Sequence, residues 1–306
     1  MNFLETFMQY GNTLPGAAAQ GLIWGIMAVG VYITFKILDL ADLTVDGSMV
    51  TGMAVCAMLM AAGWNVWPAM LIAVIAGMAC GLITGLFHTL MGIPAILAGI
   101  LTQLILWSVN LKIMGKANQA LPARSFKVLI SQLEKYHALV VLALFCVVLV
   151  VVLYWFFGTK FGSAMRATGC NEKMARAQGI NTNFHKVIGL TLSNGVVALS
   201  GALMAQYSGK ADINDGRGAI VIGLAAVIIG EVLISKLPKN FIVRLSGVIV
   251  GGIVYYIVYQ TVVFLGLDTD LLKMLSALVV AIFLAVPYLK KTYFSGHKVK
   301  EGKKNA

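Results

Sequence analysis

Charged residues are scarce in this sequence. Only 11% of its 306 residues are Asp, Glu, Lys or Arg, whereas 59% are hydrophobic and the mean hydropathy is +0.88. A soluble domain has about a quarter charged residues, so this chain lacks the polar groups that a water-facing surface requires. Lipid is therefore the expected solvent for most of the chain, and a sizeable soluble catalytic domain is excluded.

Several motifs that carry chemistry are also lacking. Cys56, Cys80, Cys146 and Cys170 are not paired at metal or redox spacing, which predicts no disulfide framework. The four histidines are far apart, so no metal site and no catalytic role is assigned to them. The sequence has no G-x-x-x-x-G-K-[ST] motif, so a nucleotide would have to bind another chain. The first residues lack the basic stretch of a cleavable signal peptide.

Long apolar runs predict an all-α polytopic membrane protein. At roughly 20 residues per span, we expect about nine (eight to ten) transmembrane helices. Residues 1–14 are expected to be an interfacial lead-in or a partial span, 15–290 the transmembrane domain, and 291–306 a basic tail. The expected spans are 16–38, 43–62, 66–90, 92–113, 137–157, 187–207, 217–235, 243–265 and 271–289.

The basic residues predict the orientation of the chain. The net charge is +11, and Lys and Arg gather in the loops 158–186 and 236–244 and in the C-terminal tail. Because positive charge accumulates on the cytoplasmic side, these segments and the C-terminus are expected there. The loop 114–136 is basic but falls on the outer side by this count. With no polar module to hold the basic residues, no nucleic-acid partner is expected.

Two apolar segments resemble each other. Residues 47–54 (GSMVTGMA) and 218–225 (GAIVIGLA) share Gly, Val, Gly and Ala at equivalent positions. In the predicted topology the first starts at the cytoplasmic face and the second at the outer face, which is typical of inverted repeats. Coincidence between two Gly/Ala-rich strings is the alternative. Small residues spaced by four, as in Gly77, Gly81 and Gly85, indicate close helix packing within the chain or a homodimer interface.

The loop 158–187 is polar and rich in helix-forming residues. It predicts one short helix around residues 163–167, a glycine break, and a second around 172–178. Two ordered helices at the inner surface would suit contact with a cytoplasmic protein. The alternative is a basic loop that only obeys the orientation rule.

The same loop resembles a known family. The run from Gly162 to Asn181 is similar to the coupling-helix loop of ABC importer permeases of the branched-chain amino acid/ribose type. Residues 37–53, 199–205 and 216–230 resemble other parts of these permeases. The spelling LADLTVDGS resembles a branch linked to uncharacterised or aromatic amino acid (tryptophan/tyrosine) uptake. The resemblance implies coupling to an ATPase through Ser163, Arg166, Ala167, Gly169, Asn171, Glu172, Arg176, Gly179 and Asn181.

The resemblance also implies partners and a location. Such permeases are homodimers in the bacterial plasma (inner) membrane, with two cytoplasmic ATPase subunits and an extracytoplasmic solute-binding protein. ATP and Mg²⁺ would bind the ATPase, and no cofactor is expected in this chain. The basic outer loop would then dock the binding protein through Arg124 and Lys127.

A few polar residues interrupt the apolar spans. Unsatisfied polar groups cost several kcal/mol in hydrocarbon, so these side chains should face protein or a water-filled path. Bonds between helices are the alternative for Gln103 and Asn194, and capping of the second span is the alternative for Asp46. The candidate path residues are Thr44, Asp46, Ser48, Pro94, Gln103, Asn110 and Asn194.

The sequence therefore predicts a permease subunit of a binding-protein-dependent ABC importer. It would move a small solute by alternating access and perform no covalent chemistry. The expected solute is an amino acid, and aromatic amino acids are among the candidates. The alternative is a secondary carrier or channel, which the shortage of ionisable residues at span centres disfavours. A membrane-embedded enzyme ranks third because no catalytic constellation is present.

Overall fold

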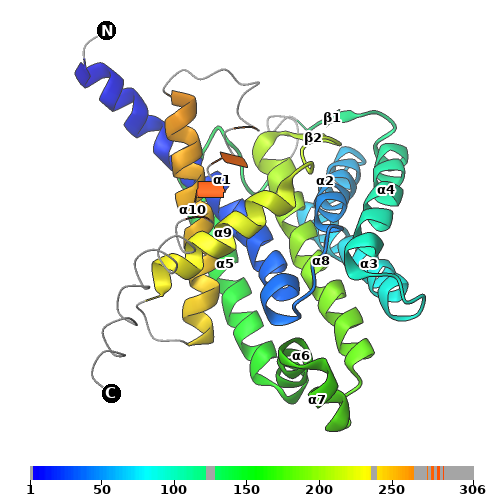
Figure 1. The fold of residues 1–306 in the computed structure, drawn as a ribbon. Coiled ribbons are helices and arrows are strands. Elements are labelled where there is room, and N and C mark those ends of the chain that lie inside the picture. Colours follow the sequence, from blue (N-terminus) through cyan, green and yellow to red (C-terminus); the bar gives the residue numbers. More distant parts are fainter. Residues whose placement is uncertain are drawn as a thin grey trace, which may run out of the picture.

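The computed structural model describes residues 3–121, 128–235 and 240–264, together with six isolated positions between 274 and 285. This part of the chain is almost entirely helical (Figure 1). Its elements are α1 (Phe3–Tyr32), the π-helical turn η1 (Ile33–Ile37), α2 (Val45–Ala61), α3 (Val66–Thr89), α4 (Ala95–Met114), β1 (Asn118–Ala120), α5 (Lys135–Gly158), α6 (Lys160–Cys170), α7 (Glu172–Ala177), α8 (Thr182–Ser208), β2 (Lys210–Asp212), α9 (Ala219–Ile234) and α10 (Phe241–Phe264).

Within the described residues, six helical segments are long and apolar enough to cross a membrane. They are the segment Thr13–Ile37, which covers most of α1 with η1, and the helices α3, α4, α5, α8 and α10. The expected spans at 43–62 and 217–235 are the shorter apolar helices α2 and α9. The ninth expected span lies outside the described ranges except for isolated positions. The prediction of a multi-pass helical membrane protein is confirmed, and six of the nine expected spans correspond to long apolar helices of the described residues.

The helices run between two distinct ends of the molecule. The short helices α6 and α7 form one end, and the antiparallel pair β1–β2 lies at the other (Figure 1). Helix α1 starts at the strand end without a break at residue 14, so the expected lead-in and first span share one helix. The expected tail 291–306 lies outside the described residues.

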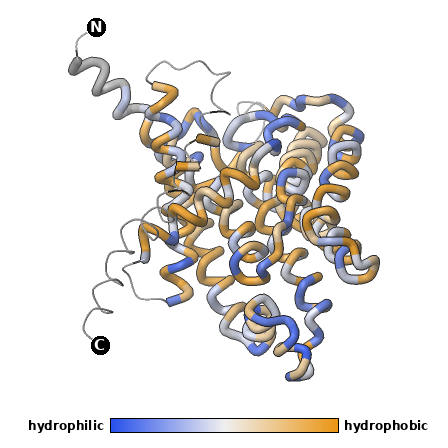
Figure 2. Tube along the Cα trace, viewed as in Figure 1, coloured by the Kyte–Doolittle hydropathy of each residue, from blue (hydrophilic) through white to orange (hydrophobic). Residues whose placement is uncertain are grey.

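Hydrophobic residues predominate along the helices between these ends (Figure 2). On α5, Val140, Leu144, Val147 and Val151 are each at least 60% exposed and recur at helical spacing. A water-soluble protein would bury such a stripe, whereas lipid solvates it. The polar residues concentrate instead at α6, α7 and the start of α8.

Glycines let the helices of the chain approach one another closely. A Cβ atom at Gly77, Gly81 or Gly85 of α3 would meet the backbone of α8 or a side chain on it. Gly21 and Gly25 of α1 abut α10 in the same way. In a membrane such close backbone packing replaces the hydrophobic drive that water supplies. The small-residue spacings therefore serve packing within the chain, as one of the two alternatives predicted.

Substitution of Gly81 should be among the most destabilising changes in the span region. A Gly81→Val side chain would collide with the Leu190 carbonyl, which belongs to the backbone and cannot rotate away. We expect a loss of about 3 kcal/mol or more in unfolding free energy and little monodisperse protein in detergent. Leu82→Val is the control, because Leu82 is 42% exposed on the same helix. Equal yields of the two variants on size exclusion would contradict this packing.

Candidate functional site

Helices α6 and α7 form a compact two-helix platform at one end of the molecule, called the platform below. Thr159 caps α6 by accepting a hydrogen bond from the Gly162 N–H at 3.2 Å. Asn171 separates the two helices and caps α7 through the Met174 N–H at 3.0 Å. Gly179, with φ of +80°, ends α7, and Asn181 then caps α8. The expected glycine break at Gly169 is wrong, because that residue lies inside α6.

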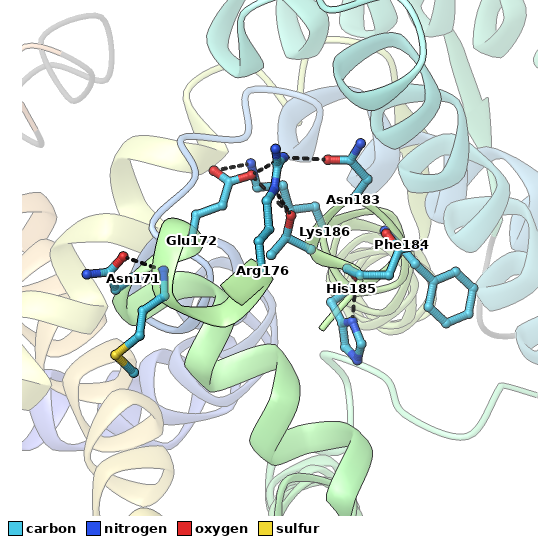
Figure 3. Close-up of polar contacts among 10 residues, drawn as sticks. Asn171, Glu172, Arg176, Asn183, Phe184, His185 and Lys186 are labelled. Carbon is cyan, nitrogen blue, oxygen red and sulfur yellow. Dashed lines mark hydrogen bonds and ion pairs between the residues drawn. The ribbon is translucent and has the colours of Figure 1, made fainter. Parts of the chain in front are cut away.

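Glu172 joins α7 to the first turn of α8 (Figure 3). Its carboxylate accepts from Arg176 Nη2 at 2.7 Å and from Lys186 Nζ at 2.8 Å. The Thr182 hydroxyl donates to the same carboxylate at 3.2 Å, and Arg176 Nε donates to Thr182 at 2.8 Å. Because these bonds close a loop across two helices, a displacement of α7 should carry the start of α8 with it.

The pKa of Glu172 should make this joint sensitive to acid. The hydrogen bond from Lys186 is the main cause that lowers the pKa of Glu172 below its ordinary value of 4.5. Since the folded pKa is depressed, the stabilisation is present above pH 4.5 and is lost as pH falls through the folded pKa. We expect Glu172→Gln to lower the melting temperature at pH 7. The difference in melting temperature between this variant and the parent chain should narrow as the pH falls below 4.5, and a difference that is constant with pH would contradict the ionic joint.

The platform also touches η1, the turn that follows α1 and ends the first membrane-spanning segment. A Cβ atom at Gly169 would collide with the Ile37 carbonyl, and one at Gly189 of α8 would meet the Leu38 side chain. On the other side, the Arg166 guanidinium lies 5.9 Å from the centre of the Phe241 ring at the start of α10. The platform is therefore in contact with three long helical segments at once.

The remaining platform residues present polar groups outward. Ser163, Arg166, Asn171 and Arg176 are exposed, whereas Ala167 and Gly169 are partly buried against the bundle. Ser163 donates to the Thr159 carbonyl at 2.8 Å. The platform thus has an inner face that packs on the spans and an outer face that is free among the described residues.

A buried polar network begins four residues after Leu38, the residue that packs against Gly189. The segment 38–44 enters the helix bundle, where Asp42 is 3% exposed. Asp42 accepts from the Thr44 N–H at 2.9 Å and from Asn194 Nδ2 at 2.7 Å, and Ser48 donates to Asn194 Oδ1 at 2.6 Å. Ser48 and Asn194 therefore tie α2 to α8, and the Thr44 hydroxyl lies 2.7 Å from that of Thr84 on α3. Asp42 was not singled out in the sequence, although its place beside an apolar run was visible there.

Asp46 caps a helix other than its own. Its carboxylate accepts from the Gly218 N–H and the Ile220 N–H, both at 2.9 Å. The expected capping of the second span is therefore wrong, because the first turn of α9 lies against the first turn of α2. The two similar segments start beside each other and not at opposite faces. From this junction α2 runs toward β2, on which it packs. Helix α9 runs toward η1 instead, where Glu231 of α9 pairs with Lys36 at 2.9 Å.

A cavity of about 200 Å³, called the polar cavity below, opens next to this junction. Three of the predicted path residues line it, namely Asp46, Gln103 and Asn110. Asn110 donates to the Gly47 carbonyl at 3.2 Å, while its Oδ1 atom is buried without a partner among the described residues. Arg217 adds a cation to the rim. Sequence reasoning missed it, because Arg217 counted only as one charge in a neutral loop.

The other candidate residues lie elsewhere. Pro94 precedes α4 at an exposed position and does not line the polar cavity. Arg124 and Lys127 lie outside the described residues. None of the described residues gather as three or more His, Cys, Asp or Glu side chains that could hold a metal ion.

Comparison with known sequences decides what kind of protein has this architecture. The family model described as the permease component of branched-chain amino acid transport systems matches residues 14–286. The chain belongs to this permease family. Its relatives are permease subunits of transport systems, so the predicted role as a non-enzymatic transport subunit is confirmed.

The relatives of the chain differ in the substrates that their names give. The chain is 39% identical to a tyrosine transport system permease protein of Clostridioides difficile, over 87% of this chain and 88% of that one. It is 33% identical to an uncharacterized protein of Rickettsia prowazekii, over 90% and 97% of the two chains. It is 27% identical to the autoinducer 2 import system permease protein LsrC of Yersinia pseudotuberculosis, over 75% and 63%. No solved structure matches the chain.

Proposed function

We propose that this permease is the membrane subunit of an ATP-driven, binding-protein-dependent importer for an amino acid. Aromatic amino acids are among the candidate solutes. The observation that carries the proposal is the platform: a two-helix unit, polar outside, that contacts η1, α8 and α10. In this proposal two copies of the chain form the translocation unit. Two separate ATPase subunits, which bind ATP and Mg²⁺, dock under the platform, and a solute-binding protein docks at the opposite end.

The proposed orientation places the platform and the C-terminus in the cytoplasm of a bacterial cell. The chain then resides in the plasma (inner) membrane with β1–β2 on the outer side. Basic residues support this, since Lys160, Arg166, Lys173, Arg176 and Lys186 all belong to the platform or its edges. Arg124 and Lys127 would meet acidic groups of the binding protein on the outer side.

Alternating access would follow from the contacts of the platform. ATP binding moves the ATPases, and α6 transmits the displacement to Ile37 and Leu38. Asp42 and Asn194 pass it to α2, and Asp46 to the start of α9. Because the two short helices diverge from one junction, a shift there would open the polar cavity toward one end or the other. Inverted repeats, with the junction near their symmetry axis, are part of this proposal.

A proton- or sodium-coupled carrier is the rival mechanism. The buried Asp42 is a carboxylate of the kind that such carriers use, so the expected shortage of buried ionisable groups does not argue against a carrier. Membership in the permease family and the platform argue for the importer instead. The C. difficile relative, which is named a tyrosine transport system permease protein, supports an amino acid as solute.

Uptake by the reconstituted complex tests the importer directly. The chain would be placed in proteoliposomes with the ATPase and binding protein that co-purify with it, and radiolabelled L-tyrosine uptake would be followed. We expect uptake that requires hydrolysable ATP on the platform side and persists with a protonophore. Uptake that is driven by a proton gradient and is indifferent to ATP would contradict the proposal.

A further inference from the structure

A second, larger cavity lies between α1, α9 and α10, three helices that pack side by side (Figure 1). Its volume is about 390 Å³, which falls within the range of small-molecule sites, roughly 300–1,000 Å³. Four aromatic residues line it: Trp24 of α1 and Tyr255, Tyr256 and Tyr259 of α10. This space is called the aromatic cavity below. Arg217 lines both this cavity and the polar cavity, so the two are neighbours.

The aromatic rings form one continuous cluster. Trp24 and Tyr256 stack with ring centroids 5.8 Å apart and an interplanar angle of 25°. Tyr256 and Tyr259 follow at 5.7 Å and 47°. Trp24 and Tyr256 are 5% and 8% exposed, so their neighbours hold them in place. Rings fixed in this way lose little freedom when another aromatic ring packs against them.

The polar groups of the cavity match the two charges of an amino acid. Trp24 Nε1 is a buried donor with no acceptor among the described residues, and leaving such a donor unpaired is costly. The guanidinium of Arg217 takes part in none of the ion pairs found in the described part of the chain. Asp215 lies two residues away and supplies the opposite charge, with Lys210 Nζ at 3.7 Å.

The first turn of α9 does not compete for the carboxylate of a ligand. The amides of Gly218 and Ile220 already donate to Asp46. The Arg217 guanidinium therefore remains available at this rim as a charged donor for an anionic group. A bidentate Arg–carboxylate pair is among the stronger polar contacts in proteins.

We propose that the aromatic cavity binds the transported solute and that this solute is an aromatic amino acid. Its ring packs among Trp24, Tyr256 and Tyr259, its carboxylate pairs with Arg217, and its ammonium lies toward Asp215. The proposal rests on the proposed function as an amino acid permease and adds a binding site and a side-chain preference to it. Because Arg217 also borders the polar cavity, the bound carboxylate stands at the entrance to that space.

Direct binding to the purified full-length chain in lipid nanodiscs tests the site without any partner protein. The probe is radiolabelled L-tyrosine, with L-leucine and tyramine as competitors. We expect L-tyrosine to compete at least about tenfold better than L-leucine, which has no ring face to stack. Tyramine, which lacks the carboxylate, should bind more weakly than L-tyrosine.

Two variants separate the roles of ring and charge. Tyr259→Leu should weaken L-tyrosine binding about threefold to tenfold, whereas Tyr259→Phe keeps the ring and should bind as the parent does. Arg217→Gln should weaken L-tyrosine at least about tenfold and leave tyramine binding unchanged. Trp67→Leu is the control, because Trp67 is 59% exposed on α3 and away from the cavity. Thermal unfolding of every variant checks that the fold is intact.

Three results would overturn the site. These are no binding of L-tyrosine to the parent chain, equal competition by L-leucine, and a loss of tyramine binding in Arg217→Gln equal to that of L-tyrosine. Uptake by the reconstituted complex distinguishes this failure from failure of the proposed function. If ATP drives uptake but the substitutions of Tyr259 and Arg217 leave the affinity for L-tyrosine unchanged, only the assignment of the aromatic cavity is contradicted. If ATP drives no uptake, the importer itself falls.

Discussion

Replacing Gly169 by alanine is expected to reduce ATP-driven uptake at least about tenfold. The added Cβ atom would collide with the Ile37 carbonyl, and this oxygen belongs to the backbone at the end of the first span. Relief requires α6 to move away from η1, at a cost of about 1–3 kcal/mol. The contact through which the platform would push the spans is then lost.

Two measurements separate loss of coupling from loss of folding. ATPase activity stimulated by the binding protein should fall together with uptake, while the amount of folded chain in the membrane stays within about twofold of the parent. Gly158→Ala is the matched control at the same end of the molecule, because a Cβ atom there meets nothing within 4 Å. Normal uptake by Gly169→Ala would show that this contact does not transmit movement.

Removal of the Asp46 carboxylate is expected to have the second large effect. Asp46→Ala leaves the Gly218 and Ile220 amides without their acceptor. Charge-assisted bonds and helix caps of this kind contribute about 1–3 kcal/mol, so we expect the unfolding free energy to fall by about 2–3 kcal/mol. Uptake should fall as well, since α2 and α9 lose the bond that joins their starts.

Two further variants serve as comparisons for Asp46→Ala, namely Asp46→Asn and Asp39→Asn. The amide oxygen of Asp46→Asn still accepts one N–H, so its stability should lie between the parent and Asp46→Ala. Asp39 is exposed, with φ of 55°, a conformation that asparagine tolerates, so Asp39→Asn removes only a charge. Unfolding in a mild detergent measures all three. A stability of Asp46→Ala equal to that of the parent would contradict its role as the cap of α9.

The sequence was most informative where local chemistry decides the structure. The polar string 158–187 predicted two short helices, and Asn171 and Asn181 cap α7 and α8 as such residues commonly do. The apolar runs predicted most helices because a membrane requires long segments with satisfied backbone groups. The glycine spacing on α3 predicted close packing.

Other features depend on contacts between distant segments and could not be predicted from local patterns. Asp46 and Gly218 are far apart in sequence, so nothing near Asp46 indicates that it caps α9 and not α2. Gly169 looks like a helix breaker by propensity, yet close packing against Ile37 explains why glycine stands inside a helix there. The role of Arg217 at the rim of two cavities requires the folded turn to bring it there.

The most direct test concerns the side and the partner of the platform. Cys170, the last residue of α6, is exposed, whereas Cys56, Cys80 and Cys146 are buried. A membrane-impermeant maleimide should therefore label the native chain at Cys170, with Cys170→Ser as the unlabelled control. The account predicts labelling in inside-out vesicles, none in intact spheroplasts, and protection by the bound ATPase. Labelling from the outer side, or labelling that the ATPase leaves unchanged, would contradict it.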